Sequence, residues 1–161
     1  MIKEFQYSNN QYSIKDLQTI LKSKNPYEIT KQDLLEQLDK ASTKEEFSSI
    51  NALLLSIHNQ TLTIPLNYNK YFSILQFKKR YNKKIKKTQI DFYAALELLG
   101  PISGILTLDV SDATIDLNVA FDKTKNFLEN DMNDISYKIN TINKIEPLYD
   151  LKLNSILDIN V

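Results

Sequence analysis

The stretch Ile105–Phe121, ILTLDVSDATIDLNVAF, decides the fold because its hydrophobic period is that of a β-strand. Apolar and polar residues alternate over residues 105–110 and again over residues 114–121, and a short polar segment separates the two runs. A period of two on both sides of a polar connection is typical of a β-hairpin. The sequence therefore predicts two antiparallel strands here.

Two other stretches also alternate. Residues 62–66 contain Pro65, which lacks a backbone N–H, so a strand there would lie at a sheet edge. Residues 149–160 alternate at the end of the chain, and we expect them to pair with the hairpin as a strand. Ile156 breaks that alternation, which leaves a helix as the alternative for this stretch.

Most of the remaining chain has the three-to-four-residue hydrophobic period of amphipathic helices. Residues suited to capping precede several of these runs, among them Ser13, Thr30 and the Ser42–Glu45 capping box. The predicted fold class is α+β, with helices packed on one face of a small antiparallel sheet. The predicted helices are residues 13–24, 30–41, 43–58, 69–86, 89–99 and 122–145, and the predicted strands of the sheet are residues 105–110, 114–121 and 149–160.

The longest predicted helix, residues 122–145, has an apolar seam with heptad-like spacing between Phe121 and Ile142. Such a seam packs either on the sheet of its own chain or on a helix of another molecule. We favour packing within the chain and keep a partner helix or a homo-oligomer as the alternative.

Residues 67–90 form a basic segment with eight Lys or Arg residues and no acidic residue, a net charge of +8. Residues 1–66 contain seven Lys and eight acidic residues, a net charge of −1. Residues 91–161 contain five Lys and twelve acidic residues, a net charge of −7. The candidate partner-binding residues are the cations of the predicted helix and of the segment just after it: Lys78, Lys79, Arg80, Lys83, Lys84, Lys86 and Lys87.

This charge separation favours a non-enzymatic assembly or interaction protein that binds an acidic surface through a Lys-rich helix. A protein partner or a homo-oligomer is the expected partner. The alternative is a nucleic-acid-binding protein that uses the same helix. The Lys-, Asn- and Ile-rich composition is typical of AT-rich codons, which suggests a structural or accessory component of a phage or bacterial complex.

Familiar catalytic motifs are missing from the sequence. There is no Cys for a thiolate nucleophile, and the two Gly residues do not allow a phosphate-binding loop. The one histidine, His58, is expected at the end of a helix, and Asp109, Asp112 and Asp116 are expected to have structural roles around the hairpin turn. We therefore expect no enzymatic activity, no metal and no cofactor.

A second alternative is a metal-dependent nuclease. Asp109, Asp150 and Lys152 would lie on neighbouring predicted strands, where carboxylates could hold a metal and the lysine could stabilise the transition state. This pattern is short and arises easily by chance.

The composition bounds the class of protein. With 161 residues, 42% of them hydrophobic and 25% charged, the chain is expected to form a single soluble domain, residues 1–161. The N-terminus has no basic region followed by an apolar run, so no signal peptide is predicted, and no apolar run is long enough to cross a membrane. A cytoplasmic or virion location is expected.

Overall fold

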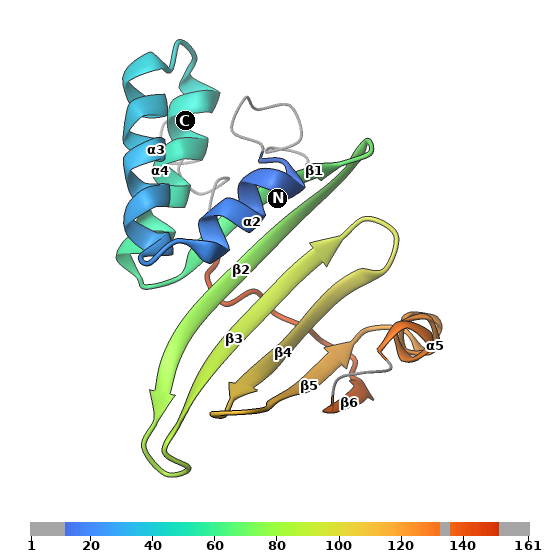
Figure 1. The fold of residues 1–161 in the computed structure, drawn as a ribbon. Helices are drawn as coiled ribbons and strands as arrows, with labels where there is room; N and C mark the ends of the chain where they lie inside the picture. The colour runs from blue at the N-terminus through green and yellow to red at the C-terminus, as the bar shows by residue number, and fades with distance from the viewer. Residues whose placement is uncertain (1–11, 133–135, 152–161) are drawn as a thin grey trace. The chain divides into compact units, whose positions relative to one another are not determined.

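The computed structural model describes residues 12–132 and 136–151, and within these ranges it contains four helices and six strands (Figure 1). The strands form one mostly antiparallel sheet in the order β1-β2-β3-β4-β5-β6, which confirms the predicted α+β class. In chain order the elements are α2 (Ile14–Lys22), α3 (Pro26–Lys40), α4 (Lys44–His58), β1 (Leu62–Tyr68), β2 (Tyr71–Asn82), β3 (Lys87–Leu96), β4 (Gly100–Leu108), β5 (Ala113–Val119), α5 (Asp122–Asp131) and β6 (Ser136–Thr141).

The chain divides into two compact units, which we describe separately. One contains the residues up to Leu75 and those from Tyr149 onward, and the other is Gln76–Leu148. The boundary falls within strand β2.

The first unit contains α2, α3, α4 and β1, and its helices begin at side-chain caps. Ser13 and Asp16 form a reciprocal capping box at α2, and Thr43 accepts a hydrogen bond from the backbone N–H of Glu46 at α4. The predicted helices at residues 13–24 and 43–58 are therefore confirmed to within two residues, although the cap of the second is Thr43 rather than Ser42.

Helix α3 begins earlier than the sequence predicted. Asn25 is its N-cap and Pro26 occupies its first turn, where a missing backbone N–H costs no helical hydrogen bond. The predicted start at Thr30 was wrong, because Thr30 lies one turn inside the helix. Its hydroxyl is buried and donates to the carbonyl oxygen of Pro26 at 2.8 Å.

Strand β1 is the first strand in the sheet order, so the predicted edge position of Pro65 is confirmed. Tyr12 forms an isolated parallel bridge with this edge. Its backbone N–H donates to the carbonyl oxygen of Pro65 at 2.8 Å, and its carbonyl oxygen accepts from the N–H of Asn67 at 2.9 Å. These two bonds satisfy backbone groups that an edge strand otherwise leaves open.

The second unit contains strands β3 to β6 and helix α5. Phe92 is aligned with Gly104 on β4, and Gly104 with Leu117 on β5. Leu117 is in turn aligned with Ile139 on β6, which is parallel to β5. Since side chains alternate along a strand, these aligned residues share one face of the sheet.

This apolar face is covered by α5, which Figure 1 shows beside β5 and β6. Leu128 and Met132 pack there against a cluster of four buried side chains. The members of this cluster are Ile102, Leu117, Val119 and Ile139.

Two of the predicted helices are strands. Residues 69–86 and 89–99 form β2, a turn and β3. On β2, Phe72, Ile74 and Gln76 are buried, while Leu75 and Phe77, on the opposite face, are partly buried. A strand with apolar residues on both faces lacks the simple alternation of a half-exposed strand, and this explains the error. The predicted hairpin is confirmed as β4 and β5.

The predicted long helix and the predicted C-terminal strand also differ from the structure. The helix predicted at residues 122–145 ends at Asp131, and residues 136–141 form β6. Of the strand predicted at residues 149–160, the first three residues form neither a strand nor a helix. The others lie outside the described residues, as do residues 133–135. Within the described part of the chain, no helix is both long enough and apolar enough to cross a membrane.

Candidate interaction surface and polar trough

The basic segment forms the end of a β-hairpin rather than a helix. We call residues Lys78–Lys87, at the end of β2, in the turn and at the start of β3, the basic hairpin. At its turn, the side-chain Oδ1 of Asn82 accepts from the backbone N–H of Lys84 at 3.0 Å and of Ile85 at 3.4 Å. Lys86 has a positive φ of 56°. An Asn side chain that bonds to the backbone two residues on is a common means of stabilising a tight turn.

Strand alternation separates the cations that the sequence analysis placed on one helix. Arg80 binds Asp91, so it lies on the face opposite the apolar face; we call this the polar face. Lys78 shares the polar face with Arg80, whereas Lys79 and Tyr81 lie on the other side of the strand. The predicted Lys-rich helix face was therefore wrong.

Two of the seven cations are already paired with carboxylates. The Arg80 Nε lies 2.9 Å from Oδ2 of Asp91, and the Lys87 Nζ lies 2.8 Å from Oδ2 of Asp109. Lys79 also has a non-covalent interaction with another residue of the chain, so it is not one of the unpaired cations.

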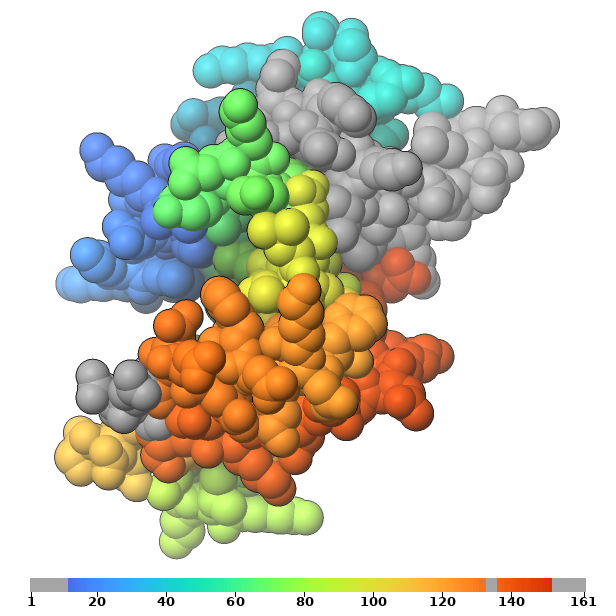
Figure 2. Space-filling model, turned by 90° about the vertical axis from the view of Figure 1, so that its right-hand side faces the viewer, coloured from blue at the N-terminus to red at the C-terminus, as the bar shows by residue number. Residues whose placement is uncertain are grey.

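The three lysines of the turn differ from these. Lys83, Lys84 and Lys86 are exposed, and none forms an ion pair with any carboxylate of the described residues. Figure 2 shows this turn, in yellow-green, projecting beyond the orange and red residues of the same unit. As far as the described residues go, the ammonium groups of these three lysines remain available to an external anion.

Exposed apolar side chains accompany these lysines. Tyr81 is 60% exposed and Ile85 is 47% exposed, both within the basic hairpin. Val110 is fully exposed in the neighbouring turn between β4 and β5, which the Lys87–Asp109 ion pair ties to the base of the hairpin. Cations interspersed with exposed apolar groups suit contact with another macromolecule.

The ion pair with Lys87 changes the acidity of Asp109. The side-chain hydrogen bond from Lys87 is the largest cause, and together with the backbone N–H of Val110 it lowers the pKa of Asp109. Because the pKa is lowered in the folded state, the pair stabilises the fold at neutral pH and this contribution is lost as the pH falls through that pKa.

We expect Lys87→Met to raise the pKa of Asp109 back toward the ordinary value of an aspartate, since the main donor to its carboxylate is removed. Carbon-detected NMR titration of the Asp109 carboxyl group measures this directly. Lys86→Met is the control, because Lys86 forms no ion pair with Asp109 and should leave the titration unchanged. An identical Asp109 midpoint in the wild type and in Lys87→Met would contradict the assignment.

The three aspartates expected to have structural roles around the hairpin turn lie in different surroundings. Asp109 is paired with Lys87, Asp112 lies in the β4–β5 turn, and Asp116 lies on β5. Among residues 12–132 and 136–151, no group of three or more His, Asp or Glu residues could hold a metal ion. For the nuclease alternative, Asp150 belongs to the first unit and Lys152 lies outside the described residues.

His58 lies in the last turn of α4 and is exposed, as predicted.

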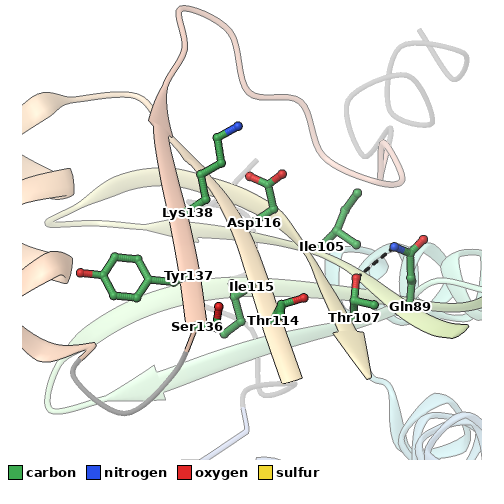
Figure 3. A pocket seen from close by; sticks show the side chains of 9 residues that line it. All are labelled: Gln89, Ile105, Thr107, Thr114, Ile115, Asp116, Ser136, Tyr137 and Lys138. Atoms are coloured by element: carbon green, nitrogen blue, oxygen red, sulfur yellow. Dashed lines mark hydrogen bonds between the residues drawn. The ribbon is translucent and has the colours of Figure 1, made fainter. Parts of the chain in front are cut away.

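The polar face contains a trough that the sequence analysis did not identify. A cavity of about 340 Å³ lies over β3 to β6 and is lined on this face by two rows of aligned residues (Figure 3). We call it the polar trough. One row is Gln89, Thr107, Thr114 and Ser136, and the other includes Ile105, Asp116 and Lys138.

These residues come from four strands and become neighbours only through the strand register. Most are uncharged and belong to no motif, so the sequence offers no signal that groups all of them. The one available hint was the alternation of Thr107, Thr114 and Asp116 with apolar residues in the predicted hairpin, which placed them on a common polar face.

No family model matches the chain, and neither a curated protein nor a solved structure is significantly similar to it.

Proposed function

We propose that this chain is a non-enzymatic interaction protein, an assembly component whose basic hairpin binds an acidic surface of a protein partner. The observation that supports this most directly is the exposure and the pairing of the three turn lysines. Lys83, Lys84 and Lys86 are exposed and have no carboxylate partner in the described residues, although Arg80 and Lys87 nearby do. Given the composition typical of AT-rich genomes, we place such a complex in a phage or a bacterium.

The chemistry of the hairpin favours a protein partner over nucleic acid. Arg80 is the one arginine of the sequence, and its guanidinium is engaged by Asp91 at 2.9 Å. Its Nε–H is thus already engaged by a carboxylate, and the sequence has no second arginine to supply the bidentate fork that recognises phosphates and guanine bases. The exposed Tyr81 and Ile85 can instead provide the apolar contacts that protein interfaces use at their centre.

The turn lysines would contribute mainly to the rate of association and to orientation. Exposed charges steer a partner of opposite sign toward the site, and salt screens this attraction. Binding should therefore weaken as the salt concentration rises, and it should depend more on the turn than on lysines elsewhere.

The test compares binding of the full chain to three immobilised probes: poly-glutamate, a glutamate–tyrosine copolymer, and duplex DNA. The triple variant Lys83→Glu, Lys84→Glu, Lys86→Glu should bind the copolymer at least about tenfold more weakly than the wild type, because attraction becomes repulsion. Lys15→Glu, Lys24→Glu, Lys31→Glu is the matched control. It makes the same change in net charge at three exposed lysines outside the hairpin and should bind as the wild type does.

Ile85→Ser tests the apolar part of the proposal. It should weaken binding to the copolymer and leave binding to poly-glutamate unchanged, since the latter offers carboxylates alone. Equal weakening in the control triple variant would overturn the proposal. Tighter binding to DNA than to the copolymer, lost in the Lys83, Lys84 and Lys86 variant, would replace it with the nucleic-acid alternative.

A further inference from the structure

We propose that the polar trough binds a small neutral carbohydrate. This inference concerns the polar face of the second unit and is independent of the function proposed for the basic hairpin. The cavity volume of about 340 Å³ is at the lower end of the range of small-molecule sites, roughly 300–1,000 Å³. It suits a ligand of one or two sugar rings.

One wall of the trough is a row of hydroxyl groups. Thr107 is aligned with Thr114, and Thr114 with Ser136, on adjacent strands. A hydroxyl group both donates and accepts hydrogen bonds, as do the hydroxyls of a sugar. Three of them in a row can therefore match a ligand with several hydroxyl groups in sequence.

Hydrogen bonds hold the side chains at one end of this row in place before any ligand binds. The side chain of Asn82 donates to Oε1 of Gln89 at 3.1 Å, and Nε2 of Gln89 donates to Oγ1 of Thr107 at 3.0 Å. Gln89 is only 8% exposed, so its position is fixed by packing as well. Because Thr107 accepts from Gln89, its own hydroxyl proton is free to donate to a ligand.

The second row places opposite charges side by side. Asp116 and Lys138 are aligned on β5 and β6 but do not form an ion pair within 4.0 Å among the described residues. Asn140 donates to Oδ1 of Asp116 at 3.1 Å and so helps to orient the carboxylate. Figure 3 shows Asp116, Lys138 and Ile105 pointing to the same side of the sheet.

This arrangement matches the chemistry of a neutral sugar. The carboxylate can accept from one ligand hydroxyl and the ammonium group can donate to another, and charge-assisted bonds of this kind are the stronger ones. The two charges cancel, so a ligand with no net charge is favoured. Ile105, aligned with Asp116, offers an apolar contact for the C–H face of a sugar ring.

A zwitterion such as a free amino acid would use Asp116 and Lys138 but would leave the row of hydroxyls with little to bind. The three hydroxyl groups therefore favour a polyhydroxylated ligand over a zwitterion. Free serine serves as the zwitterionic probe in the test.

The experiment is an NMR titration of the isotope-labelled full chain with glucose, galactose, mannose, N-acetylglucosamine and, separately, serine. At least one sugar should shift the backbone amide signals of Thr107, Thr114 and Ser136 in a saturable manner. Asp116→Asn and Lys138→Met should each weaken that binding by about tenfold, because each removes a charge-assisted hydrogen bond. Thr114→Val should weaken it as well, without any change in charge.

The matched controls are Asp131→Asn and Lys123→Met, which make the same chemical changes at exposed positions of α5 outside the trough. Both should bind as the wild type does. The proposal is overturned if no sugar shifts these signals at millimolar concentration, if the controls weaken binding as much as the trough variants, or if serine binds and the sugars do not.

Discussion

Replacing Gly104 with alanine is expected to lower the free energy of unfolding by about 3 kcal/mol, a large share of the stability of an ordinary domain. Gly104 lies in the middle of β4, where a Cβ atom would collide with the backbone carbonyl oxygen of Asp116 and lie 2.7 Å from Cζ of Phe92. The Phe92 ring can move by a rotamer change, but the carbonyl group belongs to the β4–β5 pairing. The sheet must therefore distort to admit one methyl group. Urea unfolding followed by circular dichroism measures the loss.

Two variants control for this prediction. Ser103→Ala changes the adjacent residue of β4, on the polar face, and should alter the free energy of unfolding by less than about 0.5 kcal/mol. Phe92→Leu removes the collision with the ring but also some packing on the apolar cluster, so Gly104→Ala is measured again in the Phe92→Leu background. There it should cost only slightly less than in the wild type. If Gly104→Ala cost nothing in that background, the ring, and not the backbone of Asp116, would explain why glycine is required.

The sequence predicted the N-terminal helices well because their signals are local. The capping residues Ser13 and Thr43 and the apolar spacing between them depend only on neighbours within a few residues. The hairpin of β4 and β5 was predicted for a similar reason: Leu117 and Val119 face the apolar cluster, while Asp116 and Asn118 lie on the opposite, less buried face, which gives a clear period of two.

Strands β2 and β3 could not be distinguished from helices because both of their faces are partly buried. On β3, Phe92 and Leu96 pack on the apolar cluster, yet Tyr93 and Ala95, on the polar face, are buried too. Apolar residues then occur at every spacing, and a buried helix shows the same pattern. The end of α5 was missed for a related reason. Ile139 continues the helical seam of the sequence although in the structure it belongs to a strand parallel to β5.

For the candidate sites, the composition of the sequence predicted which chemical groups are present but not how they are arranged in space. The concentration of cations at Lys78–Lys87 was evident from the sequence, whereas the pairing of Arg80 and Lys87 depends on Asp91 and Asp109, which only folding brings near. The polar trough was even less predictable from the sequence. The alignment of Gln89, Thr107 and Ser136 results from strand pairing over long sequence separations, and no local pattern encodes it.

In the first unit, we expect Leu53→Ala to reduce the free energy of unfolding by about 3 to 4 kcal/mol. Leu53 is 0% exposed in the middle of α4, so its truncation loses buried apolar contact and leaves a cavity that the surrounding helices fill only in part. Leu55, two residues along the same helix, is 46% exposed and provides a control of identical chemistry. Leu55→Ala should cost less than about 1 kcal/mol, because most of its side chain is already in contact with water.

The comparison of these two leucines also separates burial from helix propensity, which the two substitutions change equally. Urea unfolding of each variant, followed by far-ultraviolet circular dichroism, gives the two values. If Leu53→Ala and Leu55→Ala lowered the free energy of unfolding by the same amount, α4 would not contribute its Leu53 side to a packed core, and the arrangement of the first unit described here would be wrong. If only Leu53→Ala lowered the free energy of unfolding, α4 would have one face packed in the core and one face exposed to solvent.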